Sequence, residues 1–140
     1  MEEWAQEAVE LWRASREPIA KAVLEGIEQN PHLPVKKYTF DDLLQMVDGA
    51  GAMIVEELEG AGTDIRDVFI NSVWPGIFAQ GQPLSALVGQ MTMNAVLVYN
   101  VIVPQASEKN REKIGRFYIN FYVKLNLDIV KVGLECGVTS

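Results

Sequence analysis

The side chains of this chain that are best suited to chemistry are uncharged, and most of them lie in one long stretch. From Val68 to Ser107 the sequence holds no Asp, Glu, Lys, Arg or His, although the 140-residue chain is 22% charged and has a net charge of −7. Charged residues are rarely buried, so this stretch is predicted to lie mostly inside the protein. The chemistry available there is hydrogen bonding and apolar contact.

Two types of side chain in and near this stretch are typical of a ligand pocket. Methionine is flexible enough to line an irregular apolar cavity, and a buried Asn or Tyr needs a hydrogen-bond partner. We therefore predict a core pocket for a small apolar ligand, in which Met53 and Met91 contact the apolar part. Asn94 and Tyr99 would orient its polar end. The alternative is that the methionines fill gaps in the core and the polar side chains pair with each other or with the backbone.

The sequence offers little for catalysis or metal binding. No carboxylate pair, metal-ligand spacing, nucleophile beside a base or phosphate loop stands out. His32 is the only histidine, Cys136 is the only cysteine, and Asp41, Asp42 and Asp48 fit helix caps or surface positions. We expect a non-enzymatic protein without a metal or other cofactor. The net negative charge also argues against nucleic-acid binding.

Helices must position these side chains, and one of them is unusually apolar. The segment from Leu84 to Val103 is apolar on nearly every side, which predicts a buried central helix surrounded by other helices. It is long enough to cross a membrane, but four polar residues interrupt it and no basic cluster flanks it, so we expect no membrane span. The N-terminus MEEWAQEAVE lacks the regions of a secretory signal, which predicts a cytoplasmic protein.

The first half of the chain carries clear signals for helix starts. Ser15 is a suitable start for a second helix, predicted from Arg16 to Gln29, and a loop from Pro31 to Tyr38 follows it. Thr39 with Asp42 three residues later resembles a capping box, which predicts the start of a third helix. Sustained alternation typical of strands is absent from the sequence. We therefore predict an all-α fold of five to six helices in a single domain over residues 1–140.

Glycine and proline mark the later helix ends. Gly60 is expected to end the third helix, and Thr63 is expected to cap the next one. Pro75 should break or kink that helix, because it removes a backbone donor and disfavours the α conformation at Trp74. The acidic residues before Gly60 are expected to form a solvated helix end rather than a docking site.

The last helix is predicted to run from Ser107 to about Glu135 and to be apolar on two faces. One face can pack on the chain's own core, and the other then needs a partner. Two-fold dimers are the commonest soluble oligomers, so a second copy is the simplest partner. The residues that we assign to a homodimer interface are Tyr118, Tyr122, Leu127, Ile129 and Trp4.

A set of spacings over most of the chain resembles the N-terminal sensor domain of the stressosome RsbR proteins. The features are the start ELWRASREPI, the Gly-x-Pro-Leu entry from Gly81 to Leu84 and the long terminal helix. The resemblance implies a globin-like bundle that lacks haem and dimerises. Similar domains precede helix-turn-helix and diguanylate cyclase modules, and small stand-alone relatives regulate sporulation kinases and hold a fatty acid in the globin cavity. This sequence differs from the family in its uncharged central helix, and we expect no output domain within residues 1–140.

The function predicted from these observations is sensory or regulatory. The chain would act in bacterial signalling as a dimer whose core accepts an apolar ligand such as a fatty acid. The last helix would transmit to a partner whether the ligand is bound, and a signalling protein is expected as that partner. The alternative is an interaction or assembly module without a ligand, in which the aromatic face between Phe117 and Leu134 binds a partner protein.

Overall fold

The computed structural model describes residues 1–33, 36–138 and 140, and this part of the chain contains helices and no strand. The predicted all-α class is confirmed. Pro34 and Val35 of the predicted loop lie outside the described residues. The helices are α1 (Glu3–Ala14), α2 (Arg16–Gln29), α3 (Phe40–Glu59), α4 (Asp64–Val68), the π-helix η1 (Phe69–Val73), α5 (Trp74–Ala79), α6 (Leu84–Ile102), the 3-10 helix η2 (Val103–Gln105) and α7 (Arg111–Glu135).

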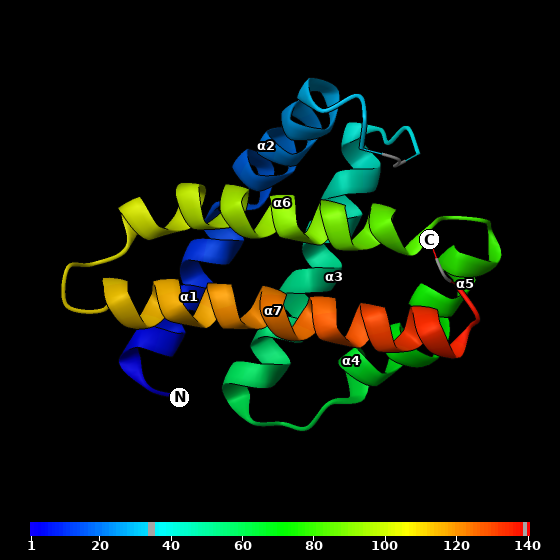
Figure 1. Cartoon of the computed structure of the whole chain (residues 1–140). Coiled ribbons are helices and arrows are strands. Elements are labelled where there is room, and N and C mark those ends of the chain that lie inside the picture. The colour runs from blue at the N-terminus through cyan, green and yellow to red at the C-terminus, as the bar shows by residue number, and fades with distance from the viewer. Residues whose placement is uncertain (34–35, 139) are drawn as a thin grey trace.

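The helices form two layers. Figure 1 shows α6 and α7 side by side and antiparallel, with α1 and α3 crossing behind them. Helix α2 packs against both α3 and α6, and α5 packs against α7. One face of the α6–α7 layer therefore lies on the other helices. The opposite face, turned toward the viewer in Figure 1, is covered by no other described element.

Most of the local signals form as predicted. Helix α2 has the predicted bounds. The Asp42 amide donates to the Thr39 hydroxyl at 3.1 Å, and the Thr39 amide donates to the Asp42 carboxylate at 3.0 Å, which completes the capping box. Gly60 ends α3 in the left-handed conformation, with φ of 65°, which glycine adopts at low cost. These contacts need only a few neighbouring residues, so the sequence shows them directly.

Pro75 does not break the helix. Trp74 keeps helical angles (φ −67°, ψ −43°), and the chain stays helical from α4 through α5. The turn before the proline widens into the π-helix η1 instead. A π turn is an accepted way to insert an extra residue into a helix, and here it accommodates the missing backbone donor. Trp74 therefore stays in the α conformation, contrary to the prediction, and no break occurs; the segment Asp64–Ala79 is one helical cover whose irregular turn is η1.

Helix α6 is buried on one face only. Ala86, Gln90, Asn94, Val98 and Ile102 follow one another at four-residue spacing and are buried. On the other side, 57% of Val96 and 38% of Tyr99 are exposed. Helices of the single chain therefore do not enclose α6 on all sides. The helix carries no charge that would mark its solvent side, so its apolar composition overstated its burial.

Three of the residues that we predicted for the dimer interface are instead buried by the chain's own helices. Tyr118, Tyr122 and Ile129 are buried in the chain's own core, with exposed fractions of 1%, 5% and 0%. They cannot face a second copy while the core is intact. Leu127 is 65% exposed, and half-buried Trp4 packs on Phe117 with ring centroids 6.0 Å apart.

The turn before α7 is held by a carboxylate from α1. Glu7 accepts hydrogen bonds from the Ser107 amide at 2.7 Å and the Ser107 hydroxyl at 2.6 Å. The Asn110 side chain donates to the same carboxylate at 3.1 Å. Ser107 therefore donates hydrogen bonds to Glu7 and does not cap α7, which begins four residues later at Arg111.

Candidate functional site: a cavity beneath α6

A cavity of about 390 Å³ lies between the two helical layers. This volume is within the range of sites for small organic ligands. Residues from every α-helix except α4 contribute to its wall, and η1 contributes as well. The wall is formed mainly by apolar and aromatic side chains, among them Trp12, Leu43, Val47, Phe69, Val73, Trp74, Ile77, Leu87 and Leu125.

Two amide side chains on α6 line this cavity, and each has one atom without a hydrogen-bond partner among the described residues. Gln90 is 2% exposed and Asn94 is 8% exposed, and both line the wall. The amide nitrogen of Gln90 and the side-chain oxygen of Asn94 have no hydrogen-bond partner among the described residues. A buried polar atom without a partner costs about 1–3 kcal/mol. Because both residues belong to the wall of an apolar cavity, their amide groups indicate a place where a ligand's polar end can be bound.

Three of the four predicted ligand-binding residues line the cavity, and one does not. Met53, Met91 and Asn94 all contribute to its wall, although ligand binding by them stays a prediction. Tyr99 lies on the opposite side of α6, where it is 38% exposed and packs over Gly115 of α7. It is excluded from the cavity because it is five residues from Asn94, and five residues place two side chains on different faces of a helix.

Sequence reasoning missed Gln90 as a site residue. Its position four residues before Asn94 is a usable signal, because residues at this spacing share one helix face. Without a charged residue in α6, however, nothing in the helix itself showed whether this polar face pointed inward or outward.

Tight contacts hold the aromatic part of the wall. Trp12 donates a hydrogen bond to the Val47 carbonyl at 3.2 Å, and its indole lies against Gly51. A Cβ at Gly51 would come within 2.6 Å of the indole nitrogen, so the glycine permits this close approach. Tyr122 lines the cavity from α7, and burial raises the pKa of its hydroxyl, which therefore stays neutral.

Charged groups lie only at the edge of the described wall. Lys36 and Asp42 are the two charged residues that line the cavity, and both are exposed. A hydrogen bond from the Thr39 backbone lowers the pKa of Asp42, so that its carboxylate stays ionised as part of the helix cap. The Lys36 ammonium lies 5.4 Å from the centre of the Tyr38 ring. Among the described residues, no group of three or more His, Cys, Asp or Glu could hold a metal ion.

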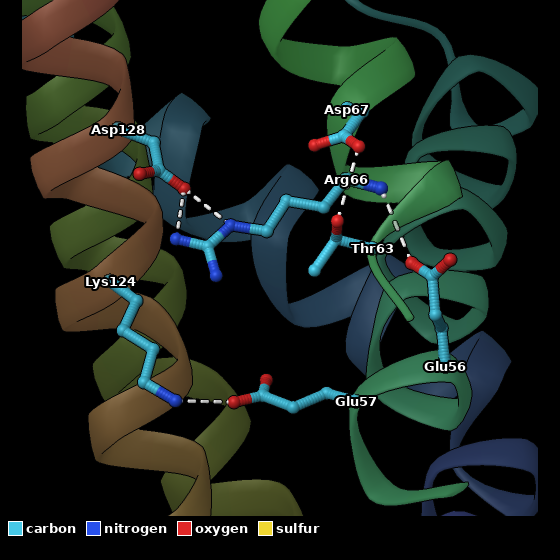
Figure 2. Close-up of polar contacts among 7 residues, drawn as sticks. All are labelled: Glu56, Glu57, Thr63, Arg66, Asp67, Lys124 and Asp128. Carbon is cyan, nitrogen blue, oxygen red and sulfur yellow. Dashed lines mark hydrogen bonds and ion pairs between the residues drawn. The ribbon is translucent and has the colours of Figure 1, made fainter. Parts of the chain in front are cut away.

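The helical cover from α4 to α5 is attached to α3 by a buried carboxylate. Glu56, 8% exposed, accepts hydrogen bonds from the backbone amides of Ile65 at 2.9 Å and Arg66 at 3.3 Å. Its carboxylate thus caps α4, where Thr63 was predicted to do so. The Thr63 hydroxyl donates instead to Asp67 at 3.1 Å. Figure 2 shows Glu56 directed at the start of α4.

The same region is joined to α7 by ion pairs. Arg66 of α4 pairs with Asp128 of α7, with its Nε 2.7 Å from a carboxylate oxygen. Glu57 of α3 pairs with Lys124 of α7. Figure 2 shows both pairs reaching across to the same helix. Because Glu56 and Glu57 have partners, the predicted solvated helix end was wrong for these two residues.

Comparisons with known proteins add no assignment. No protein-family model matches the sequence, and no similar curated protein or solved structure was found. The resemblance to the RsbR sensor domain, including its globin-like fold, therefore stays a prediction. The argument for function rests on the cavity and on the outer face of the α6–α7 layer.

The outer face of the α6–α7 layer is apolar. Val96 and Tyr99 of α6 are exposed there, as are Ile119, Val123 and Leu127 of α7, with exposed fractions between 38% and 65%. We refer to these five residues as the outer patch. The segment Leu84–Gln105 is also long and apolar enough to cross a membrane, a property shared by core helices of soluble proteins.

Proposed function

We propose that this chain is a non-catalytic sensory or regulatory domain that binds one small, largely apolar molecule between its helical layers. The observation that carries the proposal is the cavity with Gln90 and Asn94 buried in its wall and unpartnered among the described residues. A protein selected only for stability would gain from apolar residues there, because unpartnered buried amides are destabilising. Their presence is explained if a ligand completes their hydrogen bonds.

The arrangement also supports a route from the cavity to the last helix. Met53 and Leu125 line the ligand cavity and also a second cavity of about 250 Å³ behind it. The second cavity is bordered by Glu57, Arg66 and Lys124, which take part in the ion pairs to α7. A ligand that displaces Met53 or Leu125 acts on the contacts between the helical cover and α7. This is the conformational signal that we propose.

Native mass spectrometry and tryptophan fluorescence test ligand binding. Protein purified gently from cells is expected to carry a small molecule in its native mass spectrum. Trp12 and Trp74 both line the cavity, so removing that molecule and adding it back should shift their emission. Protein without any retained molecule, combined with unchanged emission across a panel of fatty acids, alcohols and amides, would contradict the proposal.

A matched pair of variants on α3 locates the binding. Ala50 lines the ligand cavity, and Ala52 lines a different cavity beside Arg16 and Glu59. Ala50→Phe is expected to fill the ligand cavity and abolish binding, whereas Ala52→Phe should leave it unchanged. Thermal unfolding by circular dichroism checks that both variants fold. Equal loss of binding in both would show that the ligand does not occupy this cavity.

The outer patch supports a second function, self-association, in place of the predicted interface. The five residues of the patch are uncharged, and on the same stripe of α7 the exposed Glu112 and Arg116 form an ion pair whose charges cancel, whereas the chain has a net charge of −7. Two copies repel each other least where their facing surfaces are neutral, so this face favours a second copy of the chain. Exposed apolar patches of this kind commonly mark protein–protein contacts.

Sedimentation velocity over a range of concentrations tests self-association. The wild-type chain is expected to form a dimer, and Val123→Glu should convert it to a monomer because it places a charge in each half of the interface. Glu10→Lys, at an exposed position of α1 behind the α6–α7 layer, is the control and should leave the dimer intact. A wild-type chain that stays monomeric at high concentration would remove the second copy as the partner.

A further inference from the structure

We propose that the cavity selects ligands whose headgroup is uncharged and both donates and accepts hydrogen bonds, and that Gln90 and Asn94 hold this headgroup. The inference rests on the proposed function, because it assigns headgroup chemistry to the same cavity. The two residues are four positions apart on the buried face of α6, so their side chains are neighbours. One small headgroup can therefore reach both.

The atoms without partners determine which headgroups fit. On α6 the Gln90 nitrogen can only donate a hydrogen bond and the Asn94 oxygen can only accept one, and the Gln82 oxygen, a third unpartnered atom of the described wall, is also an acceptor. A carboxylate can only accept and an ammonium can only donate, so each leaves one of these atoms buried and unpaired. This pairing of a donor with an acceptor belongs to the amide orientations in the structure, because rotating one amide alone by about 180° would present two donors or two acceptors. An amide or an alcohol supplies a donor and an acceptor together.

The charges around the cavity lead to the same choice. The charged residues of the described wall, Lys36 and Asp42, are both exposed at its edge, whereas Gln90 and Asn94 lie on the buried face of α6. A charged headgroup beside these amides would lose water without gaining a partner of opposite charge, which is strongly unfavourable. An uncharged headgroup avoids this cost.

Isothermal titration calorimetry at neutral pH tests the selection with four ligands that share one alkyl chain. Decanamide and decanol both donate and accept, decyl methyl ether only accepts, and decanoate is an anion. The amide and the alcohol are expected to bind at least about tenfold more tightly than the ether and the anion, since one buried hydrogen bond accounts for about that factor. Octyl and dodecyl series repeat the comparison so that chain length does not determine its result.

Variants show which residues cause the selection. In Gln90→Leu/Asn94→Leu, the ether is expected to bind as tightly as the alcohol, because the polar partners are gone. Asn100→Leu is the matched control, since Asn100 is an exposed amide on the same helix, and it should keep the wild-type preference. If the double variant does not fold, the two single variants are compared in its place.

The possible failures of this inference and of the proposed function are distinguishable. Decanoate that binds as tightly as decanamide, and loses its affinity in Lys36→Gln, would place the headgroup at the cavity edge and overturn the inference. The proposed function would survive that result. A preference that persists in the leucine variants would also overturn the inference. Absence of binding by every ligand in all three series would overturn the proposed function itself.

Discussion

The two faces of the α6–α7 layer each carry some residues of the kind expected on the other face. The inner face of α6 buries two amides, Gln90 and Asn94, and leaves atoms of both unpartnered among the described residues. The outer face exposes Val96 and Tyr99. In an ordinary amphipathic helix the polar residues would face water and the apolar residues would be buried. A second molecule can supply hydrogen-bond partners to the inner face, and another can cover the apolar residues of the outer face.

The difference separates two kinds of binding. The inner face is enclosed and offers hydrogen bonds, which suits a small molecule of defined shape and polarity. The outer face is open and offers apolar area, which suits a protein surface. The leucine substitutions proposed for Gln90 and Asn94 act on the first kind alone, and Val123→Glu acts on the second. The following predictions test whether the two faces differ in energetics as they do in composition.

The largest effect is expected from a charge placed on the inner face. Val98 is 0% exposed and Val96, two residues earlier on the same helix, is 57% exposed. Val98→Asp should lower the free energy of unfolding by about 4 kcal/mol or more, because it buries an unpaired carboxylate. Val96→Asp should change it by less than about 0.5 kcal/mol. Urea denaturation at a concentration where the chain is monomeric measures both, and equal effects would remove the distinction between the faces.

A smaller effect is expected from removing a hydroxyl. The Tyr118 hydroxyl on the inner face of α7 donates to the Ala8 carbonyl at 2.7 Å. Tyr118→Phe should lower the free energy of unfolding by about 1–2 kcal/mol, because it removes a buried hydrogen bond. Tyr99→Phe, on the outer face, serves as the control and should have almost no effect. Chemical denaturation of both variants checks this, and a costlier Tyr99→Phe would show that the outer face is packed more tightly than its exposure indicates.

Replacing an unpartnered amide is expected to stabilise the ligand-free protein. Asn94→Leu removes a buried oxygen without a described partner and should raise the free energy of unfolding by about 1 kcal/mol. Asn100→Leu on the outer face should give no such gain. Thermal unfolding of protein stripped of bound molecules provides the measurement. A loss of stability in Asn94→Leu would show that the amide supports the fold rather than a ligand.

The smallest effect concerns the turn that positions both faces. The hydrogen bond from the Ser107 side chain is the main cause that lowers the pKa of Glu7 below its ordinary value of 4.5. Since the folded state binds this proton less readily, Glu7 contributes stability above about pH 4.5, and the contribution is lost as the pH falls through the lowered pKa. Glu7→Gln should therefore be less stable than the wild type at pH 6, with the difference shrinking toward zero in acid. Melting temperatures between pH 6 and pH 3 measure it, and a constant difference would exclude the carboxylate as the cause.

Much of the helical framework could be read from the sequence because its signals are local. The Thr39–Asp42 capping box, the Gly60 terminus and the bounds of α2 each depend on a few adjacent residues. The methionine and asparagine pattern also indicated a cavity near Met53, Met91 and Asn94, and these residues do line one. Local geometry is determined by neighbours in the chain, so these features need no knowledge of the remaining fold.

Only the tertiary structure decided which way each helix faces. In α6 no charge marks the solvent side, so the sequence could not show that Gln90 points inward and Tyr99 outward. In α7 both faces are apolar, so Tyr118 and Tyr122 could equally have faced a second copy. Their burial is determined by contacts with distant segments, such as the hydrogen bond from Tyr118 to Ala8. The amino-acid sequence thus determined the helices and their ends, while packing between remote segments determined the cavity and the outer patch.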